Sequence, residues 1–191
     1  LGVEANFKAS ALQSNLNKIK AYTIAETLDE LVFDFDFPIL GSLKRSEESI
    51  NEAKASIDLS NDKIKHALFW FYKGGSNDLP AFDCLKDGDF IEATENWKKV
   101  SSTEITERNF SAYLNLSTLY FFKSLENGSI NKNLFADALN LKLKFLESEF
   151  VKTFSNSVAD STYKKTKEEL QLLFIETVNQ NFVQKGKIAI S

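Results

Sequence analysis

The sequence is poor in the residues on which several classes of protein depend. Its 191 residues include no methionine, one cysteine, one histidine, two prolines and seven glycines. The single cysteine, Cys84, excludes an internal disulfide framework, and the single histidine, His66, has no second histidine with which to hold a metal ion. We therefore expect no metal and no cofactor. The low glycine and proline content argues against a turn-rich all-β fold and favours long helices.

The chain also lacks a basic charge excess and a long apolar run. Its formal net charge is -4, which argues against a general nucleic-acid binder, because such a protein needs a concentrated basic face. No apolar run approaches the ~20 residues of a membrane span, and no signal peptide is visible. One cysteine is compatible with a reducing compartment. We expect no nucleic-acid partner, no membrane span and a cytoplasmic location.

Apolar residues at helical spacing predict helices over most of the chain. The stretch Ser49–Phe71 is predicted to form two helices joined at a polar break, Ser60–Asp62, with Gly74 and Gly75 ending the second. The 17 phenylalanines should fill much of the core. The other predicted helices cover roughly residues 9–28, 80–85, 90–100, 107–125, 131–154 and 161–182.

The second helix of the Ser49–Phe71 stretch is apolar nearly all round, because Phe69, Trp70 and Tyr72 are added to its regular stripe. Such a helix should be covered on more than one side. We therefore predict that Leu68–Tyr72 is the joint between an N-terminal unit, residues 1–75, and a C-terminal region, residues 76–191.

Residues 31–45 have a different pattern. In Leu31–Phe37 the residues alternate, with Phe33, Phe35 and Phe37 on one side and Asp34 and Asp36 on the other, which is the period of a half-buried strand or extended segment. Pro38 stops a strand ladder, and Gly41 supports a turn. We predict an extended segment here, or at most one short β-hairpin near residues 31–45.

Asp34 and Asp36 in that segment could carry chemistry, because paired carboxylates on one strand face can bind a hard cation. The sequence segment Val32–Asp36 resembles the first motif of haloacid-dehalogenase-type phosphatases. In that motif one aspartate is the nucleophile and the second is the acid/base beside Mg²⁺. That family then needs Gly-Thr and a parallel sheet, whereas Phe37 and Pro38 follow here. A metal-dependent phosphatase is therefore an alternative, and solvated carboxylates are the main interpretation.

Three features of the first 72 residues match one family pattern. They are an opening Leu1-Gly2-Val3, a spaced apolar set with neighbouring lysines, and the text Ile50–Ala53 followed by Leu59–Lys63. The apolar set and its lysines are Leu12, Leu16, Ile19, Lys18 and Lys20. In these features the region resembles a J-domain, the helical module of J-type co-chaperones.

The resemblance implies a helical fold but not the family's activity. A working J-domain carries His-Pro-Asp after its second helix, where it engages the 70-kDa heat-shock chaperone and stimulates ATP hydrolysis. The corresponding residues here are Ile24-Ala25-Glu26, and the lone His66 lies in a later helix. The unit is therefore a degenerate J-like one.

The C-terminal region contains a repeat-like sequence pattern. Leu85, Gly88, Ala93 and Trp97 have the spacing of the helix–turn–helix motif in tetratricopeptide-type (TPR-like) repeats, which the region from about residue 78 to 150 resembles. The equivalent alanine one repeat on is Ala138, 45 residues after Ala93, whereas a regular repeat has about 34. Stacked helix pairs leave a concave surface for a partner.

Together these patterns predict an all-α fold in which a degenerate J-like unit packs on a short TPR-like array. They converge on no catalytic group, so we predict a non-catalytic protein–protein interaction or scaffold module, with a chaperone system as one candidate setting. A J-type co-chaperone with a variant loop is the alternative. Tyr113 and Asn115 are expected to contact the protein partner, and no oligomeric state is predicted.

Overall fold

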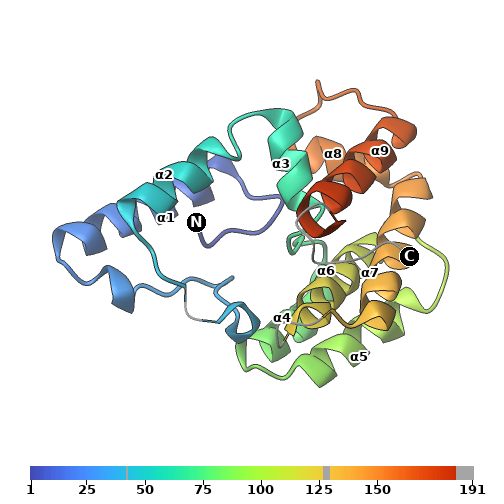
Figure 1. Cartoon of the computed structure of the whole chain (residues 1–191), viewed down its shortest axis with the longest axis horizontal. Coiled ribbons are helices and arrows are strands. Elements are labelled where there is room, and N and C mark those ends of the chain that lie inside the picture. Colours follow the sequence, from blue (N-terminus) through green and yellow to red (C-terminus); the bar gives the residue numbers. More distant parts are fainter. Residues whose placement is uncertain (42, 127–129, 184–191) are drawn as a thin grey trace.

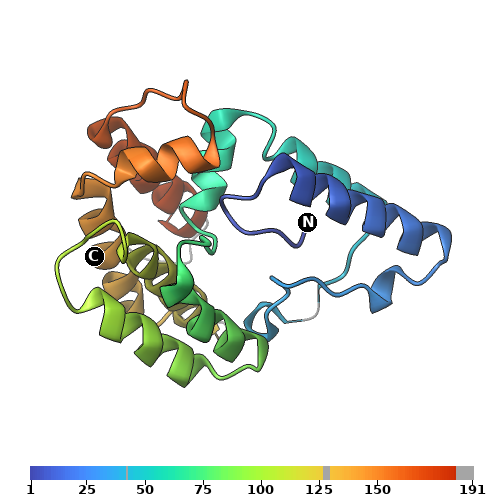
Figure 2. The same ribbon diagram turned by 180° about the vertical axis from the view of Figure 1, so that it is seen from behind.

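The computed structural model describes residues 1–41, 43–126 and 130–183. In these ranges the chain forms α-helices, short 3₁₀ turns and one π-helical turn, but no β-strand. The predicted all-α fold is therefore confirmed. Figures 1 and 2 show an arm made of helices α1 (Ala9–Ile24) and α2 (Glu47–Ala55), which lie side by side, and a bundle made of the later helices. No helix in the described ranges has the length and apolar composition to cross a membrane.

Residues 31–45, which connect the two helices of the arm, contain no β-hairpin in their described part, so that prediction is wrong. The alternation itself is confirmed, because Leu31, Phe33, Phe35 and Phe37 are all buried while Val32 is 75% exposed. A turn replaces strand pairing: the amide of Asp36 donates to the carbonyl of Phe33 at 3.0 Å. The short 3₁₀ helices Leu28–Glu30 and Pro38–Leu40 flank this segment.

The arm has a small core of its own. Ile19 is the single buried residue of helix α1, and helix α2 has none. Leu31 and Phe33 complete a cluster with Ile19, and the partly buried Leu16, Leu28 and Ile50 pack against it. Because few side chains are buried here, we expect the arm to open locally at a lower free energy than the bundle.

Helix α6 (Phe110–Ser124) is the centre of the bundle, and nearly all of its residues are buried. It packs against α5 (Phe90–Ser101) and α7 (Lys132–Glu147), and α4 (Leu79–Lys86) packs against α5. The main hydrophobic core crosses the predicted boundary at residue 75. It joins Phe37 and Phe71 to the rings of Phe82 and Trp97.

The helix predicted over residues 131–154 is broken in two. Helix α7 ends at Glu147, and helix α8 (Val151–Val158) follows after a short break. At the break the backbone of Ser148 is extended, and its hydroxyl accepts a hydrogen bond from the amide of Phe150 at 3.3 Å. The serine hydroxyl thus takes the place of the backbone carbonyl that would accept this hydrogen bond in a continuous helix. The last helix, α9 (Lys167–Val178), continues into a π-helical turn, Asn179–Val183.

Helix α3 (Ser60–Ala67) ends before the aromatic run that the sequence pattern placed inside it. The amides of Phe69 and Trp70 donate to carbonyls three residues back, at 3.0 and 3.4 Å, which tightens the last turn. The four aromatic residues that follow then contact different parts of the molecule. The ring pairs are Phe69 with Phe174, Trp70 with Phe122, Phe71 with Trp97, and Tyr72 with Phe154. The prediction that this run is covered on more than one side is confirmed.

The N-terminal segment lies along the backbone of the aromatic run. The amide of Ala5 donates to the carbonyl of Phe71 at 2.8 Å. The side chain of Asn6 exchanges two hydrogen bonds of 2.9 Å with the backbone of Lys73. These bonds fix the segment beside helix α3, where it forms one wall of the pocket described below.

Candidate binding site beside helix α3

The two residues predicted to contact a partner, Tyr113 and Asn115, lie inside the bundle. Their exposed fractions are 1% and 0%. Because other helices cover α6 along nearly its whole length, neither side chain can line a partner-binding groove, and that prediction is wrong. The hydroxyl of Tyr113 instead donates to the carbonyl of Thr103.

Asn115 belongs to a buried polar network that holds the chain after helix α3. Its side chain accepts a hydrogen bond from the amide of Tyr72 at 2.8 Å and donates to the carbonyl of Tyr72 at 2.9 Å. It also donates to Asp78 at 3.1 Å, and that carboxylate accepts from the indole of Trp97 at 2.9 Å and the amide of Gly74 at 3.1 Å. Burial raises the pKa of Asp78, whereas these donors favour its ionised form. The network fixes the direction in which the aromatic run leaves helix α3.

The second pair singled out from the sequence, Asp34 and Asp36, does not converge on a metal site. The oxygens of Asp36 lie 2.5 and 2.6 Å from the guanidinium of Arg45, and one also accepts from the amide of Phe33 at 2.8 Å. Asp34 is exposed. Within the described ranges no group of three or more His, Cys, Asp or Glu residues is placed to hold a metal ion, and no sheet carries the pair.

Two apolar pockets lie on either side of helix α3. The first has a volume of about 320 Å³ and is formed by the N-terminal segment, the end of helix α2 and helix α3. Ala53, Lys63, His66 and Trp70 are among its lining residues. The indole of Trp70 donates to the carbonyl of Val3 at 2.7 Å, which fixes the ring in the pocket wall.

The second pocket also has a volume of about 320 Å³ and is formed by helix α3, the C-terminal end of α6 and the end of α9. Phe122 and Phe182 contribute aromatic surface, and Lys65 lies at the α3 side. His66 and Phe69 line both pockets, so they form the wall that the two pockets share. The first pocket is thus on one side of this wall and the second on the other.

Two lysines flank this wall, Lys63 in the lining of the first pocket and Lys65 in that of the second, and we call this pair the α3 ridge. Lys65 lies 3.4 Å from Asp62, but their side chains are 42% and 33% exposed, so the pair contributes little stability. Partial loss of hydration lowers the pKa of His66, against the attraction of Asp62, and so favours the neutral imidazole. Glu4 is the one carboxylate among the described residues that line either pocket.

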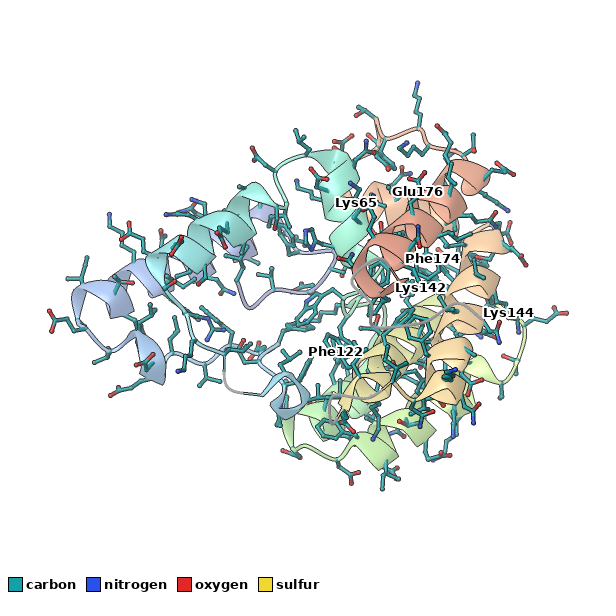
Figure 3. All side chains as sticks on the ribbon, in the orientation of Figure 1. Lys65, Phe122, Lys142, Lys144, Phe174 and Glu176 are labelled. Carbon is teal, nitrogen blue, oxygen red and sulfur yellow. The ribbon has the colours of Figure 1, made fainter. Side chains whose placement is uncertain are left out.

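The sequence pattern did not reveal Lys142, which is buried in the core. Its side chain on helix α7 is 0% exposed, and its ammonium nitrogen lies 3.3 Å from the carbonyl of Leu114 and 3.5 Å from the hydroxyl of Thr118. Burial lowers its pKa from the ordinary value of 10.5 to about 7. Figure 3 shows Lys142 within the bundle and the exposed Lys144 at its edge. Lys142 lines neither pocket, so we assign it no ligand.

No protein-family model, no curated protein and no solved structure matches the chain. The resemblances to a J-domain and to TPR-like repeats therefore remain predictions. The candidate site rests on its own geometry, which consists of two apolar pockets, a shared aromatic wall and a cationic ridge.

Proposed function

We propose that the protein is a non-catalytic protein–protein interaction module whose partner binds at the two pockets beside helix α3. The observation that carries this proposal is the pairing of two apolar pockets across the wall of His66 and Phe69. Binding sites are typically concave and mostly apolar, with a few polar groups that orient the ligand. Pocket volumes of about 320 Å³ are at the small end of the range of about 300–1,000 Å³ for ligand sites. They suit single bulky side chains of a partner.

One wall of the first pocket is held in place before any partner arrives. Trp70 is fixed by its bond to Val3, and the chain after it is fixed by the network around Asp78. A surface that is already ordered loses little conformational entropy on binding. This supports a binding role for the surface beside helix α3.

No observation favours the co-chaperone alternative. The residues that correspond to the family's tripeptide, Ile24–Glu26, form the end of helix α1. Glu26 adopts a left-handed conformation with φ +59°, and the amide of Thr27 donates to the carbonyl of Tyr22 at 3.0 Å. This is the hydrogen bonding of a helix C-terminus, so local helix termination explains the geometry of these residues.

The proposal is tested by selecting binders and asking where they bind. A random peptide library displayed on phage is selected on the full chain and then screened against a variant with both pockets filled, A53W/Q180W. Ala53 lines the first pocket and Gln180 the second. The matched control is E52W/N179W, which places the same rings at the adjacent exposed positions outside the pockets.

We expect enriched peptides to bind the wild type and the control equally and the filled variant at least about tenfold more weakly. A tenfold loss of affinity corresponds to about 1.4 kcal/mol, which is less than one buried anchor side chain of a partner contributes. Thermal unfolding curves establish that each variant is folded, and the single variants A53W and Q180W replace the double one if it is not. A selection that yields no peptide able to distinguish the filled variant from the control would contradict the proposal.

A further inference from the structure

We infer that protonation of the buried Lys142 redirects the hydroxyl of Thr118 onto the carbonyl of Trp70, so that one wall of the first pocket responds to pH. The coupling stands on contacts inside the bundle, and its consequence for partner binding rests on the proposed function. Its three parts are the burial of Lys142, the two acceptors open to the Thr118 hydroxyl, and the place of Trp70 in the pocket wall.

Lys142 is a buried base without a compensating charge. Its side chain is 0% exposed, and among the described residues it forms no ion pair. Helix α7 packs against α6, α8 and α9. On α6 the titratable side chains are the buried Tyr113 and Tyr120 and the half-buried Lys123, whereas the charged side chains of α8 and α9 and the others of α7 are exposed. Burial is the cause of the lowered pKa of Lys142, which is about 7, so the amine gains and loses its proton close to neutral pH.

Lys142 and Thr118 compete for one acceptor, the backbone carbonyl of Leu114. The side-chain nitrogen of Lys142 lies 3.3 Å from this oxygen, and the hydroxyl of Thr118 donates to it at 2.9 Å. Because Leu114 lies inside helix α6, its carbonyl also accepts the helical amide four residues further along the chain. A carbonyl oxygen has two lone pairs. Three donors therefore exceed its capacity, and the side-chain donors compete for the one place left.

The hydroxyl of Thr118 has a second acceptor within reach, the carbonyl of Trp70 at 3.4 Å. Its single hydrogen can serve only one of the two carbonyls at a time. A neutral Lys142 is a weak donor, so the shorter bond from Thr118 to Leu114 prevails. A protonated Lys142 holds the Leu114 carbonyl with a charge-assisted bond, which is roughly twice as strong as a neutral one. Its ammonium also lies 3.5 Å from the Thr118 oxygen and repels the hydroxyl hydrogen, which turns to Trp70.

Trp70 connects this exchange of hydrogen bonds to the candidate site. Its side chain lines the first pocket, and its indole donates to the carbonyl of Val3 at 2.7 Å. Its backbone carbonyl is the atom that the Thr118 hydroxyl reaches from helix α6. Protonation of Lys142 therefore ties the backbone of Trp70 to the bundle, while its ring stays tied to the N-terminal segment. The wall of the first pocket becomes tighter as the pH falls through about 7.

The test is an NMR titration of the full chain from about pH 5 to 9. The ¹³Cε shift of Lys142 measures its protonation, and the carbonyl ¹³C shift of Trp70 measures the hydrogen bond that this carbonyl accepts. We expect the two shifts to have the same midpoint, and the carbonyl shift to move downfield as the pH falls, because the bond to Trp70 becomes stronger.

The variants separate the two steps of the coupling. K142M and T118V should abolish the change at the Trp70 carbonyl, whereas T118S should keep it because serine retains the hydroxyl. K144M is the control, because it removes an exposed lysine from the same helix, and it should also keep the change. Thermal unfolding curves establish that each variant is folded, and T118A replaces T118V if that variant is not.

His66 is a second titratable group in the same wall, so H66Q is measured in parallel. A change at the Trp70 carbonyl that disappears in H66Q but persists in T118V would overturn the inference. A Trp70 carbonyl shift that does not follow the protonation of Lys142 would overturn it too. Faster hydrogen exchange of the α7 amides at low pH, in place of a carbonyl shift, would show that the helix opens locally instead, and would also overturn it.

The consequence for binding is measured with the tightest peptide from the display selection. The ratio of its affinity at pH 6 to its affinity at pH 8 should be at least about threefold greater in the wild type than in T118V, which is within the effect of one added hydrogen bond. Equal ratios in the two proteins would overturn the regulation of the site and leave the proposed function intact. A selection that yields no peptide, with the Trp70 carbonyl still following Lys142, would contradict the proposed function and support the coupling.

Discussion

The side chain of Lys142 occupies a core position on helix α7, on the same buried face as Phe135, Ala138 and Phe145. Among the described residues it forms no ion pair, and its hydrogen-bond acceptors are one carbonyl and one hydroxyl. Removing a charged ammonium from water without a carboxylate partner is costly. The folded state therefore favours the neutral amine, which is the cause of the lowered pKa.

This burial makes the stability of the protein depend on pH. Between a folded-state pKa of about 7 and an ordinary value of 10.5, the unfolded chain binds more protons than the folded one, so the free energy of unfolding should rise as the pH increases through this window. Lys142→Met should remove the rise and stabilise the protein at pH 6 by about 5 kcal/mol, because the pKa differs by about 3.5 units between the two states and each unit corresponds to about 1.4 kcal/mol. Urea unfolding at pH 6 to 10 measures both effects.

The matched control is Lys144→Met, which removes a charge from an exposed position on the same helix. It should leave the pH dependence of the free energy of unfolding as it is in the wild type. If Lys142→Met retains the wild-type slope above pH 7, the lysine is not buried as the structure has it.

Gly74 gives a second prediction at the scale of one residue. A Cβ at this position would lie 2.2 Å from the hydroxyl oxygen of Ser111 and 2.6 Å from a carboxylate oxygen of Asp78. Gly74→Ala should therefore destabilise the protein by about 1–3 kcal/mol, the usual cost of overpacking. Gly75→Ala is the control, because a Cβ there meets nothing within 4 Å, and it should change the free energy of unfolding by less than about 0.5 kcal/mol. Equal urea midpoints for the two variants would contradict the buried network.

Among the elements, the arm depends on the clamp between Arg45 and Asp36, whose side chains are 11% and 12% exposed. The guanidinium also donates to the carbonyl of Leu31 at 3.0 Å and lies 5.0 Å from the ring centre of Phe33. Arg45→Lys keeps the charge but cannot reproduce the guanidinium's simultaneous bonds to Asp36 and Leu31 or its contact with the ring. Hydrogen exchange of the amides in α1 and α2 should become about tenfold faster or more, as expected for a loss of about 1.4 kcal/mol or more.

The exchange of amides in α6 should stay unchanged in Arg45→Lys, because the small arm core is separate from the main core. Lys44→Arg, a substitution at the adjacent exposed position, should alter neither region. Uniformly faster exchange over arm and bundle would show that the two parts unfold together and would contradict a locally clamped arm.

The helices themselves were largely predictable, and the reason is periodicity. Stripes such as Leu170, Phe174 and Val178 on α9 are buried as expected. The break at Ser148 and the turn at Phe33 could not be read from periodicity, because each depends on one side chain taking a backbone hydrogen bond. The signal for Lys142 was present in the spacing of its apolar neighbours on α7, but a lysine usually marks a solvated face.

At the scale of the whole molecule, the candidate site is where segments distant in sequence meet. The first pocket joins the N-terminal residues to α2 and α3, and the second joins α3 to the ends of α6 and α9. No local sequence pattern indicates contacts between segments so far apart in the chain. The sequence pattern therefore led to the prediction of a partner surface on α6 instead. Asn115 still contributes, because its buried amide holds the chain that leads into the site.

The most direct test of the central claim, that a partner binds at the two pockets beside helix α3, is a map of amide chemical shifts. The ¹⁵N-labelled full chain is titrated with the tightest peptide from the display selection. We predict that the largest shifts occur at residues 2–7, 63–70 and 177–182, which border the pockets, while residues 79–101 in α4 and α5 are unaffected. Largest shifts in α4 and α5, with residues 63–70 unchanged, would contradict the claim.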